Sequence, residues 1–439
     1  MSARVKSYLI RDLLRCIQCG ACASACPALK PLDLSPRRIV YKARSTGEIR
    51  LEDAWKCLQC SMCTSVCPQN IDVCSMLARV RREGEMPEEM KIVSSMVLEK
   101  GISLPPLRGS EYNVELASKS LTELLKWGCS LETSLTLSAI PRAIRFIVRS
   151  HIQELPKVID GGRAYVYPGC IACNMYPSIL ESTIELLDRM GFKTILEKDR
   201  FVCCGLPLVS SGSASEELFA VTSSAILGRA MSVGADFIVT PCNGCLASIL
   251  NGIAIARSLD GLTKEISEKA STLGIRVSWD LPVYNISDIL PFRLNEVGAE
   301  SDKNLAVFYG CHYRSILSTA RIKPNALEEV VRILGRTPVI YERETGCCGG
   351  FTKTNIEVAH ELSKNILVGA GGAGADKLLL QCNGCLMNMD RAAMMLRVAG
   401  ENTVFAEPLH VCQYIMSVLK DPERYTRDLG YRSMGDMGW

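Results

Sequence analysis

The stretch ADFIVTPCNGC at residues 235–245 has a counterpart, ADKLLLQCNGC, at residues 375–385. In each copy a short apolar run leads directly into a turn that carries two cysteines separated by two residues. Such a run is typical of a buried strand, and helical periodicity precedes it in both copies. Alternating helices and strands predict a mainly parallel sheet, with the turn at the carboxyl-terminal edge where open α/β sheets bind ligands.

Further outward from these stretches, a longer unit is duplicated. The first copy begins AYVYPGC at residues 164–170, and the second begins AVFYGC at residues 306–311. Both copies then pass through an adjacent cysteine pair before the CNGC turn, and their first cysteines are 141 residues apart. We expect the five cysteines of each copy to converge at strand ends: Cys170, Cys203, Cys204, Cys242 and Cys245 in the first, and Cys311, Cys347, Cys348, Cys382 and Cys385 in the second.

Two other cysteine runs lie near the amino terminus, CIQCGACASACP from Cys16 and CLQCSMCTSVCP from Cys57. Both have the C-x2-C-x2-C-x3-C-P spacing with which bacterial ferredoxins hold paired [4Fe–4S] clusters. Three cysteines of each run wrap one cubane cluster, and the fourth reaches the other cluster. The spacing therefore predicts an electron wire of two cubane clusters, one on Cys16, Cys19, Cys22 and Cys67 and one on Cys57, Cys60, Cys63 and Cys26.

Composition limits the class of protein to which this chain of 439 residues belongs. With 48% hydrophobic and 22% charged residues it is globular, and its net charge of +3 argues against an obligate nucleic-acid binder. Residues 1–160 carry a net charge of +6 and the remainder −3, which favours a basic amino-terminal part that faces a partner or a membrane. The 22 cysteines beside only four histidines favour iron–sulfur chemistry over zinc.

The sequence also bears on location. The opening MSARVKSYLIRDLLRC has no apolar signal segment, and no run of 18 uncharged apolar residues is present. We therefore expect a cytoplasmic protein, with attachment to the inner face of the membrane through a partner as an open alternative. Helical periodicity over residues 139–152 puts Arg142, Arg145 and Arg149 on one stripe, which indicates either a packed connector helix or a docking element.

A glycine-rich run, GAGGAG at residues 369–374, matches a dinucleotide-binding fingerprint by spacing alone. That fingerprint requires a strand before it and a helix after it, whereas here a helical pattern precedes and a strand pattern follows. We therefore interpret the run as a helix-terminating turn. Since no other flavin or nicotinamide fingerprint is present, electrons are expected to come from a partner.

Five thiols in one unit exceed the four that a simple [4Fe–4S] cube takes, and two adjacent cysteines can bridge two irons or serve neighbouring metals. Two alternatives stay open, a zinc site on four of the five and a vicinal disulfide beside a redox CxxC pair. The remaining cysteines lack a motif spacing or a counterpart in the other copy, and we expect them to be dispensable for iron binding: Cys74, Cys129, Cys173 and Cys412. Cys74 and Cys412 are expected to be core residues.

The duplicated C…CCG…CxxC pattern resembles the cysteine-rich CCG domains of heterodisulfide reductase. Together with the preceding ferredoxin motifs, the chain is similar to the two-part, D-type catalytic chain of the membrane-linked enzyme of methanogenic archaea. The resemblance implies a multidomain α+β and α/β protein, in which a helical dicluster ferredoxin domain precedes two duplicated α/β CCG units in pseudo-twofold relation. We expect a ferredoxin-type domain at residues 1–90, a helical connector at 91–160, and CCG domains at 161–300 and 301–439.

The resemblance also implies a function. Each five-cysteine set would hold a noncubane [4Fe–4S] cluster, and the pair would reduce the coenzyme M–coenzyme B disulfide to two thiols. His312, directly after Cys311, is the expected proton donor. Arg314, Lys323 and Lys353 are candidates for binding the anionic ends of the substrate, by proximity in sequence. The implied partners are the small-molecule disulfide and an electron-donor subunit, either a membrane cytochrome b or a flavin or iron–sulfur subunit.

A second function shares the same order of motifs. Iron–sulfur subunits of glycolate, lactate and glycerol-3-phosphate dehydrogenases only transfer electrons, and thiol-linked fumarate reductase also uses CCG units. One CCG unit lacks cysteines in many of the dehydrogenase subunits, whereas both are complete here, which favours the disulfide reductase. One departure is that heterodisulfide reductases often have His-Met-Asn after the last cysteine, where this chain has Leu386, Met387 and Asn388.

Overall fold

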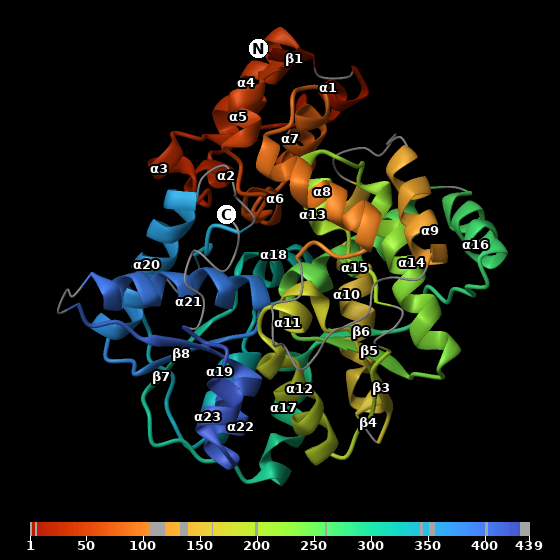
Figure 1. Ribbon diagram of the computed structural model, residues 1–439. Helices are drawn as coiled ribbons and strands as arrows, with labels where there is room; N and C mark the ends of the chain where they lie inside the picture. The colour runs from red at the N-terminus through yellow and green to blue at the C-terminus, as the bar shows by residue number, and fades with distance from the viewer. Residues whose placement is uncertain are drawn as a thin grey trace.

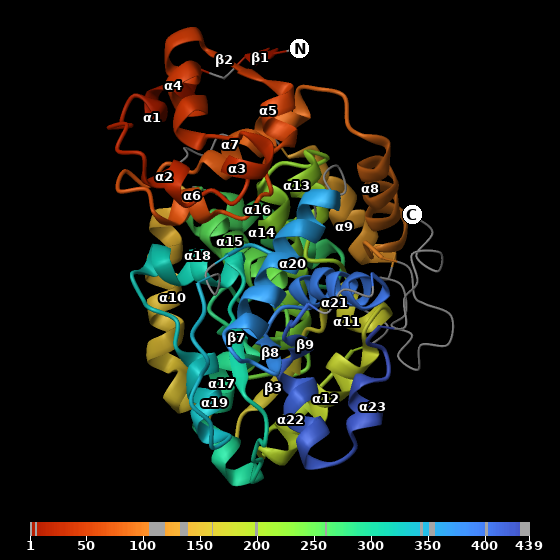
Figure 2. The same cartoon turned by 90° about the vertical axis from the view of Figure 1, so that its left-hand side faces the viewer.

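The computed structural model describes residues 2–4, 7–104, 119–131, 139–159, 161–197, 201–259, 261–342, 346–350, 356–399 and 403–430. Figure 1 shows a small amino-terminal part at the top and, below it, two α/β units beside each other. The first unit runs from yellow to green and the second from cyan to blue. Turned by 90°, Figure 2 shows helix α10 extending along the side of the molecule, below the amino-terminal part.

The amino-terminal part consists of short helices and one antiparallel strand pair, β1 with β2. Its elements are β1 (Ser2–Arg4), α1 (Ser7–Leu13), α2 (Ala21–Ser24), α3 (Leu29–Leu32), α4 (Pro36–Thr46), β2 (Glu48–Arg50), α5 (Leu51–Trp55), α6 (Met62–Ser65) and α7 (Val73–Arg82). The two ferredoxin-type motifs fold alike. Gln18 and Gln59 are left-handed, with φ of 56° and 51°, as are the caps of α2 and α6, Gly20 and Ser61, with φ of 86° and 56°. Each left-handed pair turns the chain tightly enough to point successive cysteines inward.

Three helices link this part to the first unit: α8 (Glu88–Lys100), α9 (Lys119–Ser130) and α10 (Ala139–Val158). Helix α10 packs against both α/β units, through α15 of the first and α18 of the second. Arg145 Nε donates to Thr319 O at 3.1 Å and Arg149 Nε donates to Ala320 O at 3.0 Å, so both side chains bind the last carbonyls of α18. Two arginines of the predicted stripe therefore serve packing, which the connector interpretation expects.

The first α/β unit is built on a four-stranded parallel sheet in the order β4-β3-β5-β6, as the alternating pattern predicts. Its elements are β3 (Arg163–Val166), α11 (Gly169–Asn174), α12 (Pro177–Arg189), β4 (Lys193–Ile195), α13 (Leu206–Ser211), α14 (Glu217–Ser232), β5 (Phe237–Thr240), α15 (Asn243–Ser258), α16 (Leu262–Thr272), β6 (Val283–Asn285), α17 (Ile286–Arg293) and the 3₁₀ helix η1 (Leu294–Val297). Because β4 and β5 flank β3, the strand order reverses beside β3, and ligand sites form at such switch points. Cys170 and Cys242 follow β3 and β5 at that edge.

The second unit repeats this order in the parallel sheet β7-β8-β9, and an isolated bridge between Ala306 and Val339 stands where β4 stands in the first. Its elements are β7 (Leu305–Phe308), α18 (Cys311–Ala320), α19 (Ala326–Ile333), α20 (Ile356–Gly372), β8 (Lys377–Leu380), α21 (Asn383–Val398), β9 (Glu407–His410), α22 (Val411–Leu419) and α23 (Pro422–Thr426). The glycine-rich run ends α20, and Gly374, with φ of 94°, precedes β8. A helix before and a strand after it are what the helix-terminating interpretation requires.

The two units share one hydrophobic core, which extends from Val97 to Tyr425, whereas the amino-terminal part has a smaller core of its own. The last helices of each unit also pack against the other unit. Helix α17 of the first unit packs against α19 of the second, and α22 of the second packs against α12 of the first. The apolar faces of α12 and α19 are therefore covered only when both units are folded together.

The repeat extends into these last helices. Asn285 caps α17 and His410 caps α22, each in a capping box with the residue three positions later. When these two caps are aligned, Cys412 corresponds to Ser287. Aligning the sequences LPVYNISDIL and EPLHVCQYIM without the structure would instead pair Cys412 with Ile286. Cys412 is fully buried, as expected of a core residue.

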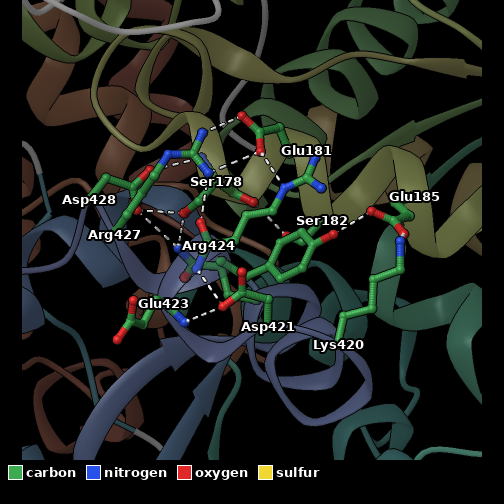
Figure 3. Close-up of polar contacts among 12 residues, drawn as sticks. Ser178, Glu181, Ser182, Glu185, Lys420, Asp421, Glu423, Arg424, Arg427 and Asp428 are labelled. Carbon is green, nitrogen blue, oxygen red and sulfur yellow. Dashed lines mark hydrogen bonds and ion pairs between the residues drawn. The ribbon is translucent and has the colours of Figure 1, made fainter.

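A polar clasp fastens the carboxyl-terminal end of the second unit to α12, as Figure 3 shows. The backbone N–H of Ser178 donates to Asp428 at 2.7 Å, and Arg427 Nη1 donates to Glu181 at 3.0 Å. Tyr425 hydroxyl donates to Glu185 on the same helix. Since Glu181 is buried, this ion pair is more constrained than a surface pair.

Among the described residues, no single helix has both the length and the apolar composition to cross a membrane. Helices α15 and α16 are bent relative to each other by 116°, and they meet the two criteria only when they are counted as one segment.

Candidate metal centres and the cysteine cavity

The structure groups the cysteines of the two ferredoxin-type motifs across the motifs. Burial raises the pKa of Cys22, and the neighbouring thiols of Cys16 and Cys67 raise it further. Burial likewise raises the pKa of Cys26 to about 12, and Cys57 of the other motif is among its neighbours. The fourth cysteine of each run thus lies near cysteines of the other run, and the ligand sets themselves stay a prediction.

The two groups differ in solvent access. In the first group Cys19 is exposed, whereas Cys57, Cys60 and Cys63 of the second are buried. The first group is therefore the one that an external electron carrier can approach directly.

Cys74 belongs to the second group in space, although it lies outside both motifs. Its Sγ is 3.8 Å from Cys63 Sγ and accepts a hydrogen bond from the backbone N–H of Ser61 at 3.2 Å. Cys74 is buried, as the sequence predicts for a core residue. Its position beside Cys63 could not be predicted from the spacing of the cysteines. Since Cys74 is on α7, which packs against α6, only the tertiary fold brings it there.

Both five-cysteine sets line one cavity, which contains about 60 Å³ of water-accessible space. The first unit contributes all five of its cysteines, and the second contributes four. The cysteines in the lining are Cys170, Cys203, Cys204, Cys242, Cys245, Cys311, Cys348, Cys382 and Cys385. Cys347 lies behind Cys311, with its Sγ 3.7 Å from Cys311 Sγ. We call this space the cysteine cavity.

Thiol contacts connect the parts of the molecule in a definite order. Cys60 of the ferredoxin-type part interacts with Cys347 of the second unit. Cys382 of the second unit in turn interacts with Cys242 of the first. In this series of thiol contacts, cysteines of the second unit link those of the amino-terminal part to those of the first unit.

Equivalent residues of the two units make the same contact across their interface. Asn243 Nδ2 donates to the carbonyl of Tyr309 at 2.5 Å, and Asn383 Nδ2 donates to the carbonyl of Pro168 at 3.0 Å. These carbonyls precede two left-handed glycines, at positions 169 and 310, with φ of 76° and 73°. A Cβ there would lie 2.8 Å from Cys245 Sγ or 3.1 Å from Cys385 Sγ, so glycine alone leaves room for the thiols.

The two halves of the cavity wall differ at equivalent positions. Ile171 follows Cys170 in the first unit, and His312 follows Cys311 in the second. Similarly, Leu206 lines the first half where Gly350 lines the second. At these two positions the first half carries aliphatic side chains, whereas the second carries an imidazole and a glycine.

His312 is half-buried, and its Nδ1 is 3.8 Å from Cys311 Sγ. Burial lowers its pKa, while a hydrogen bond with the backbone of Gln59 and the nearby thiols oppose that shift. The structure does not bring Arg314 or Lys323 into the described lining, and Lys353 lies outside the described residues. The sequence proximity of these cations to cysteines therefore gives no substrate contact in the described structure.

The structure shows hydrogen-bond donors around the thiols that the cysteine motifs alone did not predict. Gln18 Nε2 donates to Cys16 Sγ at 3.3 Å, and Gln59 Nε2 donates to Cys57 Sγ at 3.5 Å. The signal for this pair was present, since glutamine precedes the second cysteine in both motifs.

A further set surrounds the second cysteine of each adjacent pair. Thr222 Oγ1 donates to Cys204 O at 3.1 Å, and Ser363 Oγ donates to Cys348 O at 3.0 Å. Asn388 Nδ2 lies 3.6 Å from Cys348 Sγ and donates to the carbonyl of the same residue at 3.2 Å. Alignment of the two copies from their CNGC turns pairs Ser363 with Ser223 rather than with Thr222, so the sequence alone does not point to these two donors.

The chemistry of the donors fits iron–sulfur clusters. Hydrogen bonds from the adjacent thiols of Cys203 and Cys347 hold the pKa of Cys204 and Cys348 well below the usual thiol range. Thiolates are the soft ligands that iron–sulfur clusters require. Within the described parts of the chain, no three His, Cys, Asp or Glu side chains surround a position for a single ion. A four-iron cluster needs no such position, because its thiolates bind different irons.

The other cysteines outside the motifs stand apart from this network. Cys173 and Cys412 are fully buried, and neither lines the cysteine cavity. Cys129, on α9, is half-buried. None of these three cysteines occupies the position of a predicted ligand.

Comparison with known proteins defines the class of this chain. Residues 12–71 match the family described as 4Fe-4S dicluster domain, and residues 164–250 and 305–390 each match the family described as Cysteine-rich domain. The chain is thus an iron–sulfur protein that joins a dicluster domain to two cysteine-rich domains.

Its relatives include fumarate reductase subunits and two further functional groups. Lactate utilization protein A of Bacillus pumilus is 27% identical over 52% of this chain and 90% of that protein. One component of the "Ferredoxin:CoB-CoM heterodisulfide reductase" of Methanosarcina acetivorans is 21% identical over 53% of this chain and 81% of that protein. A component of the "Ferredoxin/F(420)H(2)-dependent CoB-CoM heterodisulfide reductase" of the same organism is 38% identical over 21% of this chain and 62% of that protein. The chain is related to both groups, and similarity alone singles out neither.

Proposed function

We propose that this chain is the disulfide-reducing subunit of a heterodisulfide reductase-like complex. The observation that carries the proposal is the single cavity lined by cysteines of both units. Because the two sulfurs of a disulfide are only about 2 Å apart, two metal centres can share one disulfide only across a common space. A chain that merely relays electrons has no need of such a space.

The proposed cofactors are two cubane and two noncubane [4Fe–4S] clusters. The cubane ligands are Cys16, Cys19, Cys22 and Cys67, and Cys57, Cys60, Cys63 and Cys26. The noncubane ligands are the two five-cysteine sets, and the domain limits are residues 1–90, 91–160, 161–300 and 301–439. Anaerobic analysis should then find about 16 iron and 16 sulfide per chain, whereas about 8 iron with two zinc would contradict the noncubane pair.

The contacts between thiols support one order of electron flow. Electrons would arrive at the exposed first group, pass to the buried second group, and reach the second unit where Cys60 meets Cys347. They would reach the first unit where Cys382 meets Cys242. When bound, the clusters would supply electrons singly and irons that bind substrate sulfur.

The reaction is R–S–S–R′ + 2e⁻ + 2H⁺ → R–SH + R′–SH, so the protein has to hold a disulfide between the units and deliver two protons. The reciprocal bonds of Asn243 and Asn383 connect the two halves. They support the proposal that the duplicated halves are related by a pseudo-twofold axis. His312 stands at the half of the cavity that carries Gly350, and we assign it the delivery of a proton to the sulfur held there. Ile171 keeps the opposite half apolar.

The partner that donates electrons is proposed to dock around Cys19. Leu14 and Ile17 are exposed by 61% and 62%, so an apolar surface lies beside this thiol. Arg11 and Arg37 are exposed near the same motif, with Arg37 Nε donating to Gln18. Apolar contact surrounded by guanidinium groups suits a redox protein whose own docking surface is acidic.

The proposal is tested with the intact, cluster-loaded chain. Reduced protein should cleave the coenzyme M–coenzyme B disulfide, and Cys204→Ala and Cys348→Ala should each abolish cleavage while the signals of the cubane clusters persist. Cys173→Ala is the matched control, because Cys173 is buried but outside the cavity lining. Cleavage that survives either substitution would reject the reductase.

The alternative is an electron-transfer subunit of an oxidoreductase that acts on a hydroxy acid or on fumarate. It is favoured by the match to Lactate utilization protein A, which covers 90% of that protein. In that case Cys204→Ala and Cys348→Ala would slow electron flow through the complex, and no disulfide would be cleaved by any form of the chain.

A further inference from the structure

A second cavity lies on the other side of His312 from the cysteine cavity and contains about 80 Å³ of water-accessible space. It is enclosed by α6 and α7 of the amino-terminal part, by α10, by α13, α14 and α15 of the first unit, and by α18 of the second. Among the residues that the structure describes, His312 and Leu206 alone line both cavities. We call this second space the inlet cavity.

The walls of the inlet cavity combine apolar side chains with polar ones, some of which are buried. Asp72 is held by Thr64 Oγ1 at 2.8 Å and by Ser75 Oγ at 2.9 Å. Glu216, which is 3% exposed, pairs with Arg79 at 3.0 Å. Further hydroxyl and amide side chains line the cavity beside apolar residues of α10, α13, α14, α15 and α18: Gln59, Ser61, Ser210, Asn251, Ser315 and Thr319.

A space with such walls contains water. One water needs roughly 10–15 Å³ of accessible volume and two to four polar partners, so the inlet cavity has room for about five. Ser75, Asn251 and Thr319 are half-buried, and the cavity volume includes an open mouth. Water molecules in it can therefore exchange with solvent.

The cysteine cavity has no comparable supply of its own. Among its described lining residues, Ser103, Asn243 and His312 are the polar side chains other than cysteine, and none carries a carboxyl or ammonium group. Each disulfide that is reduced nevertheless takes up two protons. Among the described residues, His312 and Leu206 form the wall that the cysteine cavity shares with the inlet cavity.

We propose that the inlet cavity is a water-filled path that supplies protons to the cysteine cavity. The inlet depends on the proposed function, since protons are consumed there only when a disulfide is reduced. Its basis is the space, its hydrogen-bonding walls and the shared boundary. Electrons arrive separately, through the thiols of Cys60 and Cys347.

The test is to fill the inlet cavity with apolar side chains. In the double variant Asn251→Leu and Thr319→Leu, turnover of the coenzyme M–coenzyme B disulfide with reduced methyl viologen should fall about tenfold. The solvent deuterium isotope effect on turnover should rise, and reduction of the clusters by viologen without disulfide should keep its wild-type rate. The control is Asn295→Leu with Thr272→Leu, because both residues are exposed and far from either cavity lining.

The single variant Asn251→Ser keeps a hydrogen-bonding wall and should retain wild-type turnover, which guards against a general effect of substitution. Unchanged turnover and isotope effect in the filled variant would overturn the inlet. An equal loss of cluster reduction would also overturn it, since the defect would then be electronic. If the wild-type chain cleaves no disulfide, the proposed function fails and the inlet fails with it, which is a different result from active wild type with an equally active filled variant.

Discussion

Cys74 changes the local chemistry of the second ferredoxin-type group without belonging to its motif. Its thiol lies against Cys63 and receives the N–H of Ser61, so one buried site contains five thiols. The reduction potential of an iron–sulfur cluster depends on hydrogen bonds to its sulfurs and on burial. A fifth thiol is therefore placed where it influences the potential of a cluster that it does not need to ligate.

We predict that Cys74→Ala keeps the iron content and alters the spectrum of one cubane cluster. The EPR signal of the cluster on Cys57, Cys60, Cys63 and Cys26 should shift, because a neighbouring dipole is removed. Cys129→Ala, which has no thiol neighbour of this kind, is the control and should leave both signals unchanged. Loss of about four irons per chain on replacing Cys74 would instead identify it as a ligand.

His410 is a second residue whose protonation state is fixed by its surroundings. Its Nδ1 accepts the N–H of Cys412 at 3.3 Å, and its Nε2 donates to the carbonyl of Pro241 in the other unit at 3.0 Å. Burial lowers its pKa to about 4, because a second proton would meet the N–H of Cys412. The free energy of unfolding should therefore decrease as the pH falls from about 6.5 toward 4, where only the unfolded chain takes up the proton.

The predicted loss is about 1.4 kcal/mol for each pH unit below 6.5. His410→Asn should reduce this dependence by the share of one histidine, because burial also lowers the pKa of His151 to about 4. Asparagine is a suitable replacement, since it caps α17 at the equivalent position 285. Urea unfolding of both proteins at pH 7 and pH 5.5, under anaerobic conditions, measures the difference. Equal slopes in the two proteins would contradict the assigned tautomer.

At the scale of elements, α10 holds α18 in place. Arg145 and Arg149 bind the carbonyls of Thr319 and Ala320, and α18 begins at Cys311. Cationic side chains at a helix carboxyl terminus satisfy free carbonyls and interact favourably with the helix dipole. The helix that carries a proposed ligand and His312 is thus anchored at its far end.

We predict that Arg145→Met and Arg149→Met each lower the free energy of unfolding by about 1–2 kcal/mol, since each removes a charged hydrogen bond. Arg142→Met, at another exposed arginine of the same stripe, should have little effect. Chemical denaturation of the three variants compares them directly. A larger effect at Arg142 than at the other two would show that the stripe stabilises the fold in another way.

The elements also show which parts of the fold the sequence could predict. The strands before each CNGC turn and the glycine-rich end of α20 follow from periodicity and turn residues, both of which are local signals. The exchange of α17 and α22 between the units, the position of Cys74 and the anchoring of α18 depend on contacts between distant segments. No spacing rule encodes such contacts, which is why the shared cavity lining, including Ser103 and Asn243, comes only from the structure.

At the scale of the whole molecule, the exposed first group at one end and the cysteine cavity deep inside define a direction. Arg11 and Arg37 lie at the exposed end, where the sequence carries its positive charge. Attraction between this surface and an acidic donor would accelerate encounter, and salt would weaken it.

We therefore predict that Arg11→Glu with Arg37→Glu slows reduction of the clusters by an acidic flavodoxin at low ionic strength by about tenfold. Reduction by methyl viologen, a small cation, should not slow. Arg276→Glu, an exposed residue of the first unit, is the control. Stopped-flow reduction at two salt concentrations distinguishes the cases, and a rate with flavodoxin that ignores both charge reversal and salt would exclude this docking surface.

The exchanged tail helices have a consequence for how this polypeptide can be encoded. A gene divided near residue 300 would yield one product whose α12 lacks α22 and another whose α19 lacks α17, each with an uncovered apolar face. Neither product could finish folding after synthesis until it had met the other product in the cell. Duplication therefore created an obligate pair, and natural selection is expected to keep both copies in a single reading frame.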